Sequence, residues 1–287
     1  MRMALVGILR AADALSCEDA ASPARRTEVA VSARLRKIVL LVAAATVCAS
    51  PAMAQGPPGG GDGVQWSLGL GVISAPRPYV GAKNTTTVIP LLELSYERFF
   101  VQGIRLGYRF TDPGPFSLAV IAGPRFLGYD ESDSPFLRGM ADRKGAIDVG
   151  LAAAWNQRRW GVAGHLRRDV SGNSDGTQAG VDVFIRRTAL GGKLRLQPAL
   201  GLEWLDGSTV DYYYGVRPSE ALPERPAYRG TSTTNVSLSL LSTYRLDSRL
   251  NLIVLLNGSL LGDGAADSPI VDRKASYFGL AGITYRF

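Results

Sequence analysis

The chain has 287 residues, a formal net charge of +7 and two cysteines. No Lys/Arg-rich run stands out after the N-terminal region, which argues against a nucleic-acid partner. Cys17 and Cys48 both precede the part that we expect to be exported. That part therefore has no Cys nucleophile, thiolate metal site or disulfide, and we expect neither a metal nor a cofactor.

The N-terminal region predicts an export signal. Basic residues at 34–37 precede an apolar run at 38–49, which is shorter than the roughly 20 residues of a membrane-spanning helix. A small-x-small site follows, so we predict cleavage between Ala54 and Gln55. The predicted organisation is an extension from a mis-assigned start codon at 1–33, a signal peptide at 34–54, a Pro/Gly linker at 55–63 and a β-barrel at 64–287.

Apolar and polar residues alternate with period two through most of the remaining chain, which is typical of half-exposed strands. Eleven such segments are visible: 65–72, 87–97, 104–110, 116–120, 147–156, 160–167, 181–186, 194–204, 235–245, 250–256 and 277–287. No apolar run of about 20 residues follows the signal, so entry into a membrane requires a closed barrel.

We therefore predict an all-β fold, a transmembrane antiparallel up-and-down β-barrel. Because both ends of such a barrel lie in the periplasm, the strand number is even, and we expect about 12 strands, with ten as the alternative. The missing strand is expected within 75–145, where Pro76, Pro78, Pro90 and Pro135 interrupt the pattern. Tight connections near 157–158, 189–192 and 247–248 alternate with longer ones at 127–144, 170–177, 206–230 and 261–273.

The last segment carries an aromatic face and ends on Phe287, as the closing strand of an outer-membrane barrel does. We interpret Tyr277, Gly279, Ile283, Tyr285 and Phe287 as the C-terminal signal read by the barrel-assembly machinery. The alternative is an edge strand of a soluble β-sandwich.

The polar face of the strands carries charges of both signs, which we expect to line a narrow, watery lumen. The predicted lumenal network comprises Glu93, Arg105, Arg109, Asp148, His165, Arg167, Asp182, Arg195, Glu203, Arg245 and Arg286. The alternative is that these charges face bulk solvent.

Two features raise the question of chemistry or binding. His165, with Arg167 and Asp169 on the same face, is a weak candidate for a lipid-modifying hydrolase, and a lumenal polar network explains it better. Tyrosines in the longest loop suit a binding surface, although an interfacial girdle or loop packing is an equal alternative. The candidate partner surface comprises Tyr212, Tyr213, Tyr214, Gly215, Ser268, Pro269 and Asp272.

An ordered set of short motifs resembles the MipA/OmpV family of outer-membrane proteins over essentially all of the exported chain. They are Trp66 to Gly71, Leu106 to Phe110, Ser134-Pro135 with Gly139 and Asp142, Arg168 to Gly172, Tyr213 to Val216, Arg225 to Tyr228, Ser268 to Asp272 and Tyr285 to Phe287.

The resemblance implies an outer-membrane barrel of a Gram-negative bacterium, embedded in lipid; it assigns no catalytic residues to this chain, and we expect it not to be an enzyme. It further implies a scaffold that brings a lytic murein transglycosylase together with a penicillin-binding protein in peptidoglycan synthesis. The alternatives are a narrow outer-membrane pore, a surface adhesin or antigen, and the hydrolase that uses His165.

Overall fold

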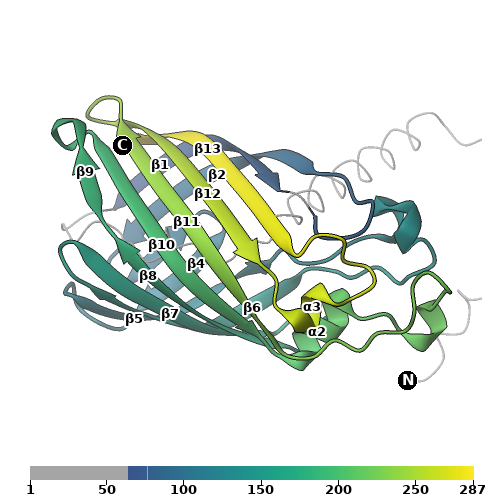
Figure 1. Cartoon of the computed structure of the whole chain (residues 1–287). Helices are drawn as coiled ribbons and strands as arrows, with labels where there is room; N and C mark the ends of the chain where they lie inside the picture. The colour runs from purple at the N-terminus through teal and green to yellow at the C-terminus, as the bar shows by residue number, and fades with distance from the viewer. Residues whose placement is uncertain (1–63, 76) are drawn as a thin grey trace, which may run out of the picture. The chain divides into compact units, whose positions relative to one another are not determined.

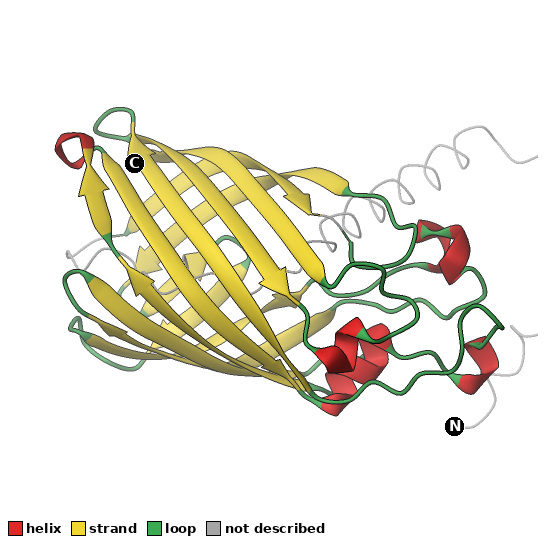
Figure 2. Cartoon of the chain, in the orientation of Figure 1, coloured by secondary structure: helices red, strands yellow, loops and turns green. Residues whose placement is uncertain are grey.

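The computed structural model describes residues 64–75 and 77–287, which form an antiparallel β-structure (Figures 1 and 2). The predicted extension, signal peptide, cleavage site and linker lie outside these residues and remain predictions. The strands are β1 (Gln65–Ala75), β2 (Thr85–Tyr96), β3 (Phe99–Gln102), β4 (Arg105–Arg109), β5 (Phe116–Arg125), β6 (Ala146–Asn156), β7 (Trp160–Asp169), β8 (Thr177–Ile185), β9 (Arg187–Ala189), β10 (Leu194–Leu205), β11 (Thr233–Arg245), β12 (Leu250–Leu260) and β13 (Ala275–Arg286).

The sheet closes on itself. Each strand pairs with its sequence neighbours, and β1 pairs with β13, with Leu68 opposite Tyr285. The strands β8 and β9 occupy one position, because both pair with β10 on either side of Arg186. The barrel therefore has twelve strand positions, which confirms the predicted architecture.

The missing strand is β3, in the interval where we expected it. It escaped the periodicity analysis because it is only four residues long and pairs with just Glu93–Tyr96 of β2. The connections that we named alternate between short and long as expected; the exception is the two-residue turn between β3 and β4, which points toward the loop end. We call the end with the C-terminus and the short turns the turn end, and the opposite end the loop end (Figure 1).

The side chains that point outward are apolar. Leu70 and Leu238 are 66% and 65% exposed, and similar outward positions recur on every long strand. Such a surface costs free energy in water and is stable in lipid. None of the helices in the described part of the chain is long and apolar enough to cross a membrane.

Aromatic side chains ring the turn end. Trp66 of β1 stacks on Phe287 with ring centroids 3.7 Å apart, which joins the first and last strands. Trp155 and Trp160 pack edge to face across the turn between β6 and β7. These rings form one of the two interfacial girdles expected of a membrane barrel, and Tyr285 and Phe287 of the proposed assembly signal belong to it.

The long connections fold together at the loop end. We call segments 77–84, 126–145, 206–232 and 261–274 the loop cap. It contains α2 (Gly207–Tyr214), α3 (Asp263–Ala266) and the short helices η3 (Glu131–Asp133), η4 (Pro135–Leu137) and η6 (Pro218–Glu220); η5 (Leu190–Gly192) lies at the turn end. The largest cluster of buried apolar side chains in the described chain lies in the loop cap, not in the barrel.

Candidate functional site

The inward-facing side chains divide the lumen into two sectors. Residues of β1, β2 and β11–β13 form an apolar sector, whose buried members include Ile73, Leu255 and Phe278. The buried charged residues Asp148, Arg167 and Asp182 lie on the opposite side, on β6–β8, where apolar residues such as Phe184 are also buried. Apolar side chains such as Phe278 therefore line the lumen together with polar ones, whereas the sequence analysis expected charges only.

A polar network centres on Glu203 of β10. His165 Nε2 lies 3.2 Å from Glu203 Oε1, and Arg167 Nη2 lies 3.7 Å from the same oxygen and 3.1 Å from His165 Nε2. With its amide oxygen turned toward β7, Gln178 accepts hydrogen bonds from Arg167. Gly180 provides the space, since a Cβ there would clash with both His165 and Glu203.

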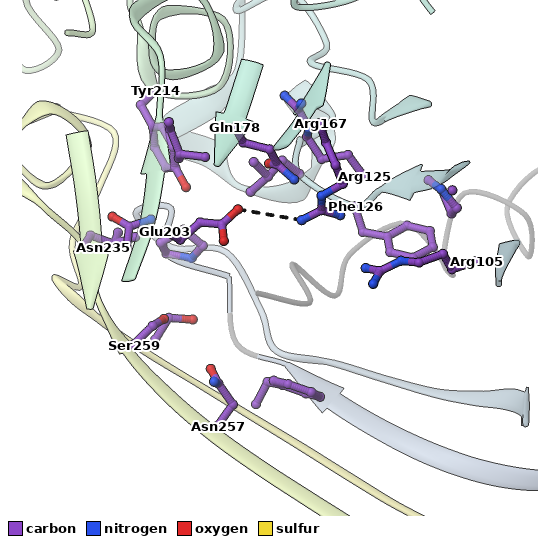
Figure 3. A pocket seen from close by; sticks show the side chains of 18 of the residues that line it. Arg105, Arg125, Phe126, Arg167, Gln178, Glu203, Tyr214, Asn235, Asn257 and Ser259 are labelled. Carbon is purple, nitrogen blue, oxygen red and sulfur yellow. Dashed lines mark ion pairs between the residues drawn. The ribbon is translucent and has the colours of Figure 1, made fainter. Parts of the chain in front are cut away.

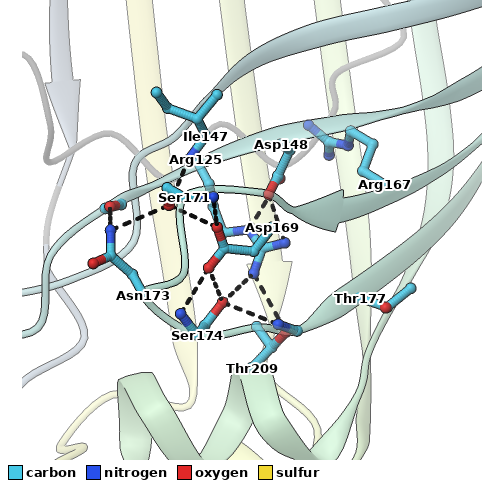
Figure 4. A network of polar contacts seen from close by, with 12 residues as sticks. Arg125, Ile147, Asp148, Arg167, Asp169, Ser171, Asn173, Ser174, Thr177 and Thr209 are labelled. Carbon is cyan, nitrogen blue, oxygen red and sulfur yellow. Dashed lines mark hydrogen bonds and ion pairs between the residues drawn. The ribbon is translucent and has the colours of Figure 1, made fainter.

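This network also bears on the hydrolase alternative. Arg167 contacts His165 as expected, but Asp169 does not orient the imidazole. Its carboxylate instead accepts hydrogen bonds from Ser171 and Ser174 in the β7–β8 loop (Figure 4). No serine or threonine hydroxyl bonds to His165 among residues 64–75 and 77–287, so the described geometry offers no nucleophile–base pair of the hydrolase type.

A second network ties the barrel wall to the loop cap (Figure 4). Arg125, the last residue of β5, forms a buried ion pair with Asp148 at 2.8 Å. Its other guanidinium nitrogen donates to Ser174 and to Thr209 of α2, each at 3.3 Å. The sequence analysis missed Arg125 because the expected strand ended at residue 120. Continuing the period-two alternation to residue 125 would have placed its side chain in the lumen.

The remaining predicted lumenal charges are dispersed. Asp182 is buried beside Gly201, and Arg105 points into the lumen from β4. Glu93 accepts a hydrogen bond from Ser67 at 3.2 Å. Four arginines lie at the turn end, where the lumen opens: Arg109, Arg195, Arg245 and Arg286. The structure thus brings together His165, Arg167 and Glu203 and leaves the other predicted members outside that network.

The tyrosine loop lies mostly inside the loop cap. Tyr213 and Tyr214 are 0% and 2% exposed, and Gly215 and Ser268 are also buried. Their side chains therefore offer no contact surface, and the packing alternative describes them. Tyr212 and Pro269 are half-buried and Asp272 is exposed, so only these three retain the candidate surface role.

An ion pair lies at the centre of the loop cap. Arg143 and Glu220 side chains are 2% and 6% exposed and lie 2.8 Å apart. Burial disfavours the Glu220 carboxylate, but hydrogen bonds from Arg143 and from two backbone N–H groups outweigh it and lower the pKa of Glu220. Burial raises the pKa of the neighbouring Tyr129 to about 12, against the opposing influence of Arg143. Both groups therefore hold their ordinary protonation states over a wide pH range.

A cavity of about 100 Å³ lies in the lumen beneath the loop cap (Figure 3). Its arginines come from β4, β5 and β7, and Figure 3 shows Asn235, Asn257 and Ser259 across from them. The cavity lining consists of Pro78, Ile104, Arg105, Gly123, Pro124, Arg125, Phe126, Leu127, Arg167, Gln178, Glu203, Leu205, Tyr214, Asn235, Asn257, Ser259, Leu261, Ser276 and Phe278.

The turn end is strongly basic. We call its exposed cations the basic rim: Arg98, Arg158, Arg159, Arg187, Lys193, Arg195, Arg245, Arg249 and Arg286. The exposed carboxylates at this end are Glu93, Glu97, Asp112 and Asp247, and Asp112 forms an ion pair with Arg98 at 2.7 Å. The excess of positive charge favours an acidic partner at this end.

Comparison with known proteins gives consistent matches. The family model described as MltA-interacting protein MipA matches residues 68–287. The putative outer membrane protein YiaT of Escherichia coli K12 is 29% identical over 224 residues, 77% of this chain and 90% of that protein. The MltA-interacting protein of E. coli K12 is 26% identical over 230 residues, 78% of this chain and 90% of that protein. A solved outer-membrane channel of Pseudomonas putida F1 is similar with a TM-score of 0.42 and 11% identity, covering 81% of this chain and 97% of that one.

Proposed function

Because this chain belongs to the MipA family of MltA-interacting proteins, we propose that it is a non-enzymatic scaffold whose turn end docks a lytic murein transglycosylase and a penicillin-binding murein polymerase. The family match confirms the resemblance read from the sequence motifs. The relatives are outer-membrane proteins, and this chain is an outer-membrane barrel. The turn end accordingly faces the periplasm, where murein enzymes act.

The basic rim is the observation that carries this proposal. The periplasmic turns are short, so a partner meets a shallow ring of side chains and not a protruding domain. Arg158 and Arg159 project from one turn, and Arg187 and Lys193 lie near the next. Exposed charges of one sign accelerate association and select partners of opposite charge, with a strength that falls as salt rises.

The closed loop end supports a role that does not depend on passage through the barrel. The loop cap packs a continuous apolar cluster over the lumen, with Leu137, Val210 and Ile270 each 0% exposed. Below it, Phe100 and Phe184 fill the lumen toward the turn end. Side chains thus occupy much of the lumen, as they do in small barrels that do not enclose an aqueous channel.

Charge reversal tests the docking surface. Purified transglycosylase should bind the detergent-extracted wild-type protein, and Arg158→Glu with Arg159→Glu should weaken binding by about tenfold or more at low salt. The matched control reverses Arg273 and Lys274, an exposed basic pair at the loop end, and should bind like the wild type. Addition of the penicillin-binding polymerase should then give a three-component complex. Equal affinity of the Arg158/Arg159 variant would place docking elsewhere, and no binding by the wild type would end the proposal.

The narrow pore is the second candidate, and the filled lumen weighs against it. A planar-bilayer recording separates the two functions. We expect no steady unit conductance from the wild type, because the packed loop cap covers one end of the lumen and aromatic side chains occupy the other. Steady conductance steps would favour the pore.

A further inference from the structure

The barrel wall has a notch between β2 and β5. The intervening strands β3 and β4 span four and five residues, whereas β2 and β5 span twelve and ten. The strand β4 pairs only with Ala119–Ala122 of β5. Beyond the hairpin turn at Gly103, neither long strand has a strand partner on this side within the described residues. We call the region bounded by 85–91, 103–104 and 123–125 the notch.

Proline residues mark both margins of the notch. The carbonyl of Leu92 accepts a hydrogen bond from Gly103 N, so it points toward the hairpin, and alternation directs the nitrogen of Pro90 to the same side. Likewise, the carbonyl of Leu118 accepts from Phe110 N, which directs the nitrogen of Pro124 toward the notch. Proline lacks the N–H of a strand pair and occurs at strand edges. The chain therefore encodes this interruption of the barrel.

The cavity beneath the loop cap reaches the notch. Its lining includes Ile104 and Arg105 from the hairpin margin, and Gly123 and Pro124 from the β5 margin. The loop cap covers the end of the barrel above it. The notch lies in the half of the wall nearer the loop end, which adjoins the outer leaflet in this orientation.

The three arginines that line the cavity differ in whether they have a direct partner. Arg125 pairs with Asp148, and Arg167 lies against Glu203 and His165. Arg105 forms no direct hydrogen bond or ion pair with any described residue; Glu203 and Asp148 attract it from longer range, and Arg167 repels it. A buried cation that lacks a direct partner is costly, and a bound anion in contact with it offsets that cost.

The size and polarity of the cavity define the ligand. A volume of about 100 Å³ is well below the roughly 300–1,000 Å³ of pockets that enclose whole drug-sized ligands. It accommodates a small anionic head group, with Asn235, Asn257 and Ser259 supplying further hydrogen bonds. The lining residues Ile104 and Pro124 at the two margins are apolar and face the membrane side, so the remainder of the ligand is an apolar chain.

We propose that this cavity binds the carboxylate head of a single-chain amphiphile, which enters from the outer leaflet with its chain lying in the notch. This site is at the opposite end of the barrel from the basic rim. Ligand binding at this site is measured on the purified protein without murein enzymes. Its outcome is therefore independent of whether the scaffold proposal is correct.

Equilibrium binding of labelled dodecanoate in non-ionic detergent tests the site, with protein-free micelles as background. Wild-type protein should bind saturably, and Arg105→Gln should weaken binding by about tenfold or more, because a charge-assisted contact is lost. The matched control is Arg109→Gln, on the same strand and the same face but outside the cavity lining; it should bind as the wild type does.

Two comparison ligands identify the source. Dodecanol, which lacks the charge, and butanoate, which lacks the chain, should both bind far more weakly than dodecanoate. Equal binding of butanoate would assign the site to a free anion from solution and overturn the membrane amphiphile. Equal dodecanoate affinity in the wild type and Arg105→Gln, or no saturable binding by the wild type, would overturn the site itself.

A second variant keeps the charge and fills the space. A Cβ at Gly123 would lie 3.4 Å from Arg105 Cα, an ordinary contact distance, so Gly123→Leu should fold and occupy the cavity. Heat-modifiable gel mobility confirms the folded barrel. Dodecanoate binding should fall by about tenfold, and undiminished binding in the folded variant would show that the ligand lies elsewhere.

Discussion

Arg143 and Glu220 lie 77 residues apart in the chain and meet inside the loop cap, where Arg143 Nη2 donates hydrogen bonds to both carboxylate oxygens at 3.1 and 2.8 Å. Arg143 also donates from Nε to the Tyr212 carbonyl at 2.7 Å. One side chain therefore fastens the 126–145 segment to the 206–232 segment at two points, and the loop cap depends on it.

Removal of this arginine should loosen the loop cap and leave the barrel folded. Arg143→Met leaves the Glu220 carboxylate buried without its partner, which costs about 3–5 kcal/mol for a buried pair. Limited proteolysis of the protein in proteoliposomes should show new cleavage in 206–232. Arg138→Met, an exposed arginine in the same segment, serves as the control and should keep the wild-type pattern. An unchanged pattern in Arg143→Met would mean that the apolar cluster alone holds the loops.

The same pair predicts acid sensitivity of the loop cap. The pKa of Glu220 is lower in the folded protein than in the unfolded chain, so its stabilising contribution is present above the unfolded value of about 4.3 and is lost as the pH falls through the folded pKa. The protection factors of the loop-cap amides, which are corrected for the intrinsic pH dependence of exchange, should fall below about pH 4.3. Glu220→Gln should show weaker protection at neutral pH and a flatter acid dependence. A wild-type profile that does not change with acid would contradict this assignment.

A methyl group at Gly180 should disrupt the lumenal network. The Cβ in Gly180→Ala would clash with His165 and Glu203, and overpacking of this kind costs about 1–3 kcal/mol. Urea unfolding monitored by tryptophan fluorescence should show a lower midpoint. Gly279→Ala is the matched control, because its Cβ would meet only Leu256 Cδ2 at 3.6 Å. Equal midpoints for both variants would mean that His165 and Glu203 can move away from the added methyl group without loss of stability.

The barrel seam should depend on the terminal phenylalanine. Phe287→Ala removes the stack on Trp66, and aromatic pairs contribute about 0.5–1.5 kcal/mol beyond area burial. We expect a smaller heat-modifiable fraction on gels after refolding into lipid and lower yields in the outer membrane. Tyr96→Ala, an exposed aromatic residue on β2 outside the predicted signal, is the control and should assemble like the wild type. Equal loss in both variants would instead indicate a general effect of aromatic girdle residues.

Much of the barrel could be predicted because lipid and lumen impose a strict alternation on each strand. Leu200 and Leu202 face outward while Gly201 and Glu203 face inward, and this pattern is local in sequence. The hairpin of β3 and β4 was partly hidden because a four-residue strand holds too few alternations to distinguish from noise. Pro90, which blurred the pattern there, in fact marks the margin of the notch.

The loop cap could not be predicted in this way. Tyr213 and Tyr214 are buried by residues from three other segments, including Tyr79 and Ile270, and no local period reports such contacts. The pairing of charged residues in the lumen could not be predicted either, because it also depends on contacts between distant segments. The sequence placed Arg105 and Asp148 on the inner face, but only the fold shows that Asp148 is paired with Arg125, and not with Arg105.

The shared interior of the loop cap also governs what the cell surface can display. A larger side chain at Val210 or Ile270 would displace the neighbouring loops that pack against it. The loops are therefore expected to vary as one unit and not as four independent epitopes. The turn at Pro223 and Glu224 is different, because both residues are exposed and the bridge between Leu222 and Arg225 closes behind them. A short peptide tag inserted there would reach antibodies on intact cells, whereas one inserted between Tyr213 and Tyr214 would have to displace the interior first.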